Sequence, residues 1–174
     1  MGNGEWGMGN WELGMGNWEL QFNNLTMNKF LSFSLTPEVE AMLPSQQLAT
    51  ILSLDPTTIV PIPDMPAAVV GVSLWQGQVL WLVDLAYLLG FEPLLTPEYH
   101  QSKRSVLRVT SPGKTLGLLV HQVGQLMRFK TQQIQPPTTM ITSTTGQYIK
   151  GTVRNYQDET LLIVDVEAIL EGFE

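Results

Sequence analysis

The chain has 174 residues, of which 44% are apolar and 14% are charged, a composition that suits one globular domain with a substantial core. Sixteen acidic residues against nine basic ones give a net charge of −7, which excludes a protein that binds nucleic-acid phosphates through clustered Lys and Arg. The absence of cysteine and the presence of only two histidines, His100 and His121, exclude a disulfide framework, a thiol nucleophile and a metal site rich in Cys or His, and no motif indicates a cofactor.

Residues 1–26 form a low-complexity tandem in which Gly-Asn-Trp-Glu-Leu recurs. Two glycines in each unit argue against a coiled coil, because each glycine inside a helix costs about 1 kcal/mol. We predict that this segment is disordered or not native and that the natural start is Met27; an aromatic docking tail built on Trp6, Trp11 and Trp18 is the alternative. Signal-peptide features are absent and no apolar run approaches the roughly 20 residues of a membrane helix, so we expect a cytoplasmic protein without direct membrane insertion.

Short strands are predicted along most of the remaining chain. Pro37 and Pro44 interrupt the pattern after the first strand, so any helix between them has at most two turns. Residues 61–66 are punctuated by prolines and are predicted to form a surface loop. Closely spaced short strands are typical of a β-barrel or a β-sandwich. The predicted strands cover residues 29–35, 48–54, 69–74, 78–83, 105–110, 116–120 and 126–130.

An internal repeat relates residues 71–89 to residues 151–170. Each copy begins with a glycine, Gly71 or Gly151, and continues as a strand, a turn and a second apolar strand. Each then reaches an aspartate, Asp84 or Asp165, that opens a short helix, where an N-cap side chain is worth about 1 kcal/mol. The repeat predicts two similar halves, each a small barrel closed by its own hairpin and helix, which leaves no free strand edges.

These segments resemble CheW-like domains, the adaptor modules of bacterial chemosensory arrays. The resemblance covers residues 28–174, so the domain is expected to comprise residues 27–174. It implies an all-β fold with short helices, made of two intertwined five-stranded SH3-like β-barrels. The segments that carry it are Lys29 to Leu35, the hairpin from Val70 to Gly77 with Val83-Asp84-Leu85, Leu116 to Val123, Gln133 to Pro137, and Tyr148 to Leu170.

The resemblance implies a non-catalytic adaptor that couples a CheA-like histidine kinase to the cytoplasmic tip of a chemoreceptor, recruited to membrane-associated arrays. The sequence departs from the family at the first hairpin turn, where Leu74, Trp75, Gln76 and Gly77 replace the common Asn-Leu-Arg-Gly. A common Glu is replaced by Thr50. Losing the Arg removes a fork of donors, whereas a tryptophan offers a large apolar anchor. We therefore predict that Leu74, Trp75, Gln76 and Thr50 bind the partner, and that the partners are specialised.

Several alternatives stay open at this level. Asp84 and Asp165, with His121, could serve a hydrolase, although the repeat favours a structural role for both aspartates. A barrel that binds a small ligand is the main alternative function, and it requires an enclosed pocket. Trp81 is predicted to pack in the core, and the basic cluster of Lys103, Arg104 and Arg108 is predicted to lie on a solvated strand edge.

Overall fold

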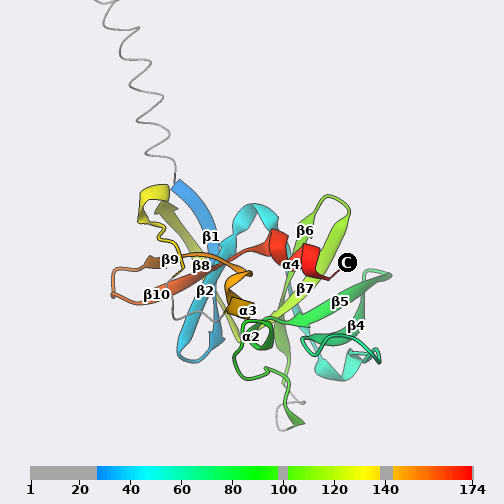
Figure 1. Cartoon of the computed structure of the whole chain (residues 1–174). Helices are drawn as coiled ribbons and strands as arrows, with labels where there is room; N and C mark the ends of the chain where they lie inside the picture. The colour runs from blue at the N-terminus through cyan, green and yellow to red at the C-terminus, as the bar shows by residue number, and fades with distance from the viewer. Residues whose placement is uncertain (1–26, 98–101, 138–142, 174) are drawn as a thin grey trace, which may run out of the picture.

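The computed structural model describes residues 27–97, 102–137 and 143–173, and within them two five-stranded sheets lie side by side (Figure 1). The first sheet has the order β8-β1-β2-β10-β9 and the second has the order β3-β6-β7-β5-β4. The strands of the first sheet are β8 (Gln122–Lys130), β1 (Met27–Thr36), β2 (Val39–Pro44), β10 (Thr160–Val164) and β9 (Ile149–Arg154). Those of the second are β3 (Leu48–Leu54), β6 (Arg104–Ser111), β7 (Lys114–Val120), β5 (Gln78–Asp84) and β4 (Val69–Trp75).

Short helices connect these strands. Among the described residues the α-helices are α2 (Leu85–Leu88), α3 (Ser143–Gly146) and α4 (Val166–Gly172), and the 3₁₀ turns are η1 (Ser45–Gln47), η2 (Pro56–Thr58) and η4 (Thr131–Gln133). In the described part of the chain no helix is long and apolar enough to span a membrane.

The two sheets repeat one pattern of strand pairing. In each, a hairpin (β4–β5 or β9–β10) joins the rest of the sheet through one parallel contact, β5 with β7 or β10 with β2. All other pairs are antiparallel. The first sheet combines the N-terminal strands β1 and β2 with β8, β9 and β10 from the C-terminal part, so the chain leaves it and returns to it. The expected pair of intertwined five-stranded barrels is confirmed.

A single backbone bridge closes each sheet into a barrel. After β3 and η2, Val60 pairs with Val72 of β4 through two backbone hydrogen bonds of 2.8 and 2.9 Å. After β8 and η4, Gln135 pairs with Thr152 of β9 through two bonds of 2.8 Å. These bridges satisfy edge groups that would otherwise invite pairing with other chains.

The glycine that opens each repeat lies under its bridge. A Cβ on Gly71 would stand 2.3 Å from the carbonyl oxygen of Val60, and the φ of Gly71 is +137°. A Cβ on Gly151 would stand 2.8 Å from the carbonyl oxygen of Gln135. Both positions therefore need a residue without a side chain so that two backbones can approach each other.

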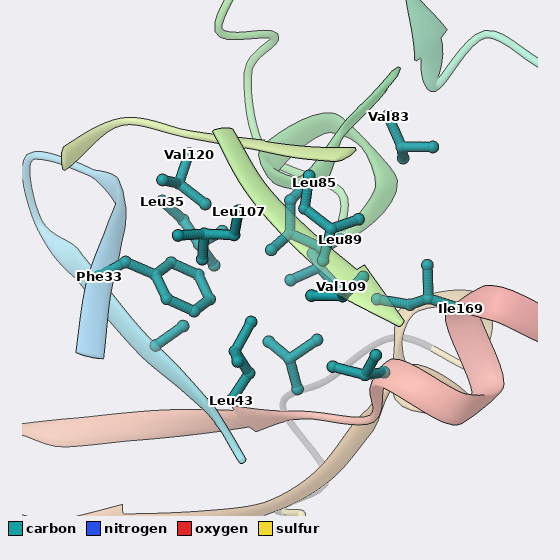
Figure 2. Close-up of a cluster of buried hydrophobic side chains, with 14 of the residues drawn as sticks. Phe33, Leu35, Leu43, Val83, Leu85, Leu89, Leu107, Val109, Val120 and Ile169 are labelled. Atoms are coloured by element: carbon teal, nitrogen blue, oxygen red, sulfur yellow. The ribbon is translucent and has the colours of Figure 1, made fainter. Parts of the chain in front are cut away.

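The two barrels share one hydrophobic cluster (Figure 2). Phe33 and Leu35 of β1 and Leu43 of β2 enter it from the first barrel, and all three are fully buried. There they meet fully buried side chains from strands β6 and β7 and from helices α2 and α4. A smaller cluster fills the interior of each barrel, around Phe30 and Phe129 in the first and around Leu82 and Val106 in the second. The side chains that Figure 2 labels from the second barrel and from the helical segments are Val83, Leu85, Leu89, Leu107, Val109, Val120 and Ile169. Because they pack in one cluster with side chains of the first barrel, the two barrels form one body.

One strand was not predicted from the sequence. The segment between Pro37 and Pro44 forms strand β2, because β1 and β10 pair with it on both sides and its buried residues pack into the hydrophobic clusters. Pro44 is the last residue of β2, where a missing N–H is tolerated.

The expectation that each barrel is closed by its own helix is wrong for the first barrel. Helix α4 follows β10 of the first barrel but contacts β6 and β7 of the second.

Candidate partner-binding surface

The β4–β5 hairpin presents two different faces at its free end. Gln76 and Gly77 form the two-residue turn with φ values of +48° and +77°, as a type I′ turn requires. Both turn residues are exposed. The side chains of Leu74 and Trp75, which precede the turn, point to opposite faces of the strand because successive side chains alternate. The hairpin thus offers one surface on its outer face and another at the mouth of the second barrel.

The outer face carries an exposed apolar patch made of Val60, Leu74 and Val79, which we call the outer patch. Leu74 lies directly opposite Val79 in the register, and their side chains are 75% and 61% exposed. Val60, at the barrel closure, is 58% exposed, and all three line a shallow surface cavity beside β3. Exposed apolar side chains that gather in this way are typical of a protein interface.

The mouth of the second barrel is built around Arg108 of β6. The Cζ atom of Arg108 lies 4.5 Å from the ring centroid of Trp75, so the guanidinium is stacked on the indole. Thr50 of β3 is paired with Arg108 in the strand register and is half-buried. Trp75 itself packs against the hydrophobic cluster inside the second barrel. The tryptophan therefore forms a platform that holds the arginine in place.

The four predicted partner-binding residues do not form one group. Trp75 and Thr50 both adjoin Arg108, whereas Leu74 lies on the outer patch and Gln76 lies at the tip between the two faces. Sequence reasoning missed Val60 and Val79, whose exposure depends on the barrel closure and on the hairpin register. Residues 79–83 are all apolar, so the sequence contains no alternation that would separate the outward-facing Val79 and Trp81 from their inward-facing neighbours.

Two expectations about side chains near this hairpin are wrong. Trp81 is 37% exposed on the outer face of β5, opposite Val72, and does not pack in the core, because the hairpin register turns it away from the barrel interior. Arg108 does not lie on a solvated strand edge, since β6 is hydrogen-bonded on both sides, to β3 and to β7.

The two repeated aspartates both cap helices. Asp84 is 2% exposed; its Oδ1 accepts a hydrogen bond from the backbone N–H of Tyr87 at 3.1 Å, and its Oδ2 accepts one from Leu94 at 2.7 Å. Burial raises the pKa of Asp84, against the opposing effect of these backbone hydrogen bonds. Asp165 accepts one such bond, from Ala168 at 3.1 Å. Asp84 therefore caps α2 and also anchors the loop that follows it.

We predict that Asp84→Ala lowers the free energy of unfolding by about 2–3 kcal/mol, because it removes a cap and leaves the half-buried Leu94 N–H without its acceptor. Asp165→Ala, which removes a cap alone, is the matched variant and is expected to cost about 1 kcal/mol. Urea denaturation monitored by circular dichroism measures both values. Equal losses in the two variants would contradict the second role assigned to Asp84.

The hydrolase alternative finds no support in the geometry of these groups. All hydrogen bonds to the carboxylates of Asp84 and Asp165 recorded in the described chain come from backbone N–H groups. His121 is exposed, and the acid that it influences is Glu40, whose pKa is raised by burial and by Glu159 and lowered by His121. Among the residues that the structure describes, no group of three or more His, Asp or Glu side chains could hold a metal ion.

The ligand-binding alternative requires an enclosed pocket, and the barrel interiors are packed with side chains instead. Leu82, Val106 and Leu119 in the second barrel are fully buried against one another, and Phe30 and Phe129 meet in the first with ring centroids 6.4 Å apart. Two cavities of about 600 Å³ each, one at the start of β1 and the other beside the β1–β2 turn, are open to solvent.

Comparison with known proteins agrees with this architecture. Residues 29–174 match the family model of the CheW-like domain. The chain is 27% identical over 108 residues to chemotaxis protein CheV3 of Helicobacter pylori (strain ATCC 700392 / 26695), a match that covers 61% of this chain and 33% of that protein. It therefore spans about a third of the length of this curated relative. The crystal structure of the scaffolding protein TtCheW from Thermoanaerobacter tengcongensis is similar with a TM-score of 0.68 at 20% identity, over 81% of this chain and 90% of that chain.

Proposed function

Because the chain belongs to the CheW-like domain family, which its residues 29–174 match, we propose that it is a non-catalytic adaptor of bacterial chemosensory signalling. It couples a CheA-type histidine kinase to the cytoplasmic tip of a chemoreceptor or to an equivalent array component. The domain comprises residues 27–174, and it works in the cytoplasm, recruited to membrane-associated arrays by its partners. The relatives named a chemotaxis protein and a scaffolding protein support this role.

The observation that carries the proposal is the outer patch on an otherwise well-closed fold. Side chains fill the interior of both barrels, and backbone bridges close both barrels, so neither interior is suited to bind a ligand. Leu74 and Val79 are largely exposed, so the fold does not require apolar side chains at these two positions. A strongly exposed apolar pair is best explained by a protein partner that covers it.

The shared cluster explains how such an adaptor could pass on a signal. Since the two barrels bury side chains in one cluster, they move as one body, and a partner held on one barrel has a defined orientation relative to a partner held on the other. A receptor state that favours one arrangement of this complex then biases the kinase through contact alone.

We expect Leu74→Asp to weaken binding of the CheA-type kinase from the same genome by about 30-fold or more, because it places a charge in an apolar contact. Tyr156→Asp is the matched control: Tyr156 is fully exposed at the turn of the equivalent β9–β10 hairpin in the first barrel. Isothermal titration calorimetry with the purified kinase measures the affinities. If wild type does not bind, or if Leu74→Asp binds as wild type does, the proposed function or its surface is wrong.

A further inference from the structure

We infer that Arg108 is the carboxylate-binding group of the docking surface, and that the partner segment carries an acidic side chain next to apolar ones. The inference rests on the proposed function and adds the chemistry of the partner. Arg108 was not among the predicted partner-binding residues, and it reaches the hairpin from a different strand, β6.

The guanidinium of Arg108 is held in a fixed orientation but is not paired with an acid. Its Cζ atom lies 4.5 Å from the centroid of the Trp75 ring. Within residues 27–97, 102–137 and 143–173, no carboxylate forms an ion pair with Arg108. The chain has sixteen acidic residues and nine basic ones, so carboxylates for such a pair are not scarce. An arginine that the fold holds in place, but whose charge no carboxylate of the described chain neutralises, is suited to bind a carboxylate of another protein.

Stacking on Trp75 prepares this arginine for a carboxylate. The contact with the ring is made through the centre of the guanidinium, at Cζ, and the ring accepts no conventional hydrogen bond from its N–H groups. These N–H groups form a fork that matches the two oxygens of a carboxylate. Because the stack already restricts the side chain, little conformational entropy remains to be lost on binding. The register neighbour Thr50, the turn residue Gln76 and Gln78 at the start of β5 are uncharged, so none of them competes for the guanidinium.

Arg108 and the outer patch lie on opposite faces of the hairpin, and this arrangement defines the order of contacts on the partner. Leu74 and Trp75 are consecutive residues that face opposite sides of the hairpin, so a segment that crosses the free end of the hairpin meets both faces. Apolar side chains of that segment cover Leu74 and Val79, and an Asp or Glu side chain reaches the guanidinium at the barrel mouth. Charge complementarity thus selects an acidic segment with apolar neighbours.

The test compares variants of Arg108 in calorimetric titrations with the CheA-type kinase. Arg108→Met keeps an apolar stem on Trp75 but removes the charge, and we expect it to weaken binding by about tenfold or more and to reduce the dependence of affinity on salt. Arg108→Lys keeps the charge without the fork and is expected to lie between Arg108→Met and wild type. Arg154→Gln removes the same charge at the end of β9 in the other barrel and is expected to bind as wild type does.

Thermal unfolding of each variant shows that binding is measured on folded protein, and Arg108→Lys preserves the comparison if Arg108→Met does not fold. If both Arg108 variants bind as wild type does while Leu74→Asp binds weakly, the inference is wrong and the proposed adaptor function stands. If wild type does not bind the kinase, the proposed function fails and the inference fails with it.

Discussion

Gly71→Ala is expected to lower the free energy of unfolding by about 3 kcal/mol or more. The new Cβ would stand 2.3 Å from the backbone oxygen of Val60, a distance that no side-chain rotation can relieve. The φ of +137° adds strain, because residues with a Cβ avoid that region. Relief requires the bridge between Val60 and Val72 to open, so the second barrel loses its closure together with two backbone hydrogen bonds.

Gly77→Ala separates these two effects. Gly77 also has a positive φ, +77°, but a Cβ there would meet no atom within 4 Å. We expect it to cost only about 1–2 kcal/mol, from backbone conformation alone. Guanidinium denaturation of both variants gives the comparison. A Gly71→Ala protein that is as stable as Gly77→Ala would show that the contact with Val60 does not constrain the fold.

Phe33→Ala is expected to destabilise the protein by about 3–5 kcal/mol, the usual cost of removing a buried aromatic side chain. Phe33 is fully buried in the cluster that both barrels share. Its loss should therefore lower the unfolding temperature of the whole domain while the transition stays single. Differential scanning calorimetry measures both properties, since the ratio of calorimetric to van't Hoff enthalpy reports whether unfolding occurs in one step.

Phe91→Ala is the matched control for this experiment. Phe91 is half-buried at the margin of the same cluster, so truncating it creates little cavity and should cost about 1–2 kcal/mol. Two separate transitions in the Phe33→Ala protein would mean that the barrels unfold independently and that the shared cluster does not join them.

Local features of the fold were accessible from the sequence, because they depend on residues close together in the chain. The β4–β5 and β9–β10 hairpins follow from a turn between two apolar strands, and the short helices follow from an aspartate at the end of each hairpin. The resemblance of several segments in order then supplied the arrangement of two intertwined barrels. Strand β2 escaped detection because its run of buried residues has no alternation and its flanking prolines equally suit the ends of a helix.

The candidate surface was accessible only in part. Exposure of Gln76 follows from its place in a two-residue turn, and Leu74, two residues before it, could be proposed with it. The stack of Arg108 on Trp75 depends on how β6 is placed relative to β4, and the sequence contains no signal of that placement. The same limit applies to Val60, whose position is set by the barrel closure.

The interleaving of the first sheet governs the order in which the protein can be completed during translation. The second sheet uses a continuous stretch, from Leu48 to Val120, and has all its strands once that stretch has left the ribosome. Strands β1 and β2 emerge earlier than any of these and can pair with each other, but β1 meets its second partner, β8, only after the second sheet is complete, and β2 meets its second partner, β10, only when Val164 has been synthesised. Until then one edge of β2 is unpaired and its apolar side chains are exposed in the nascent chain. During this period the strand is open to aggregation and is a target for chaperones.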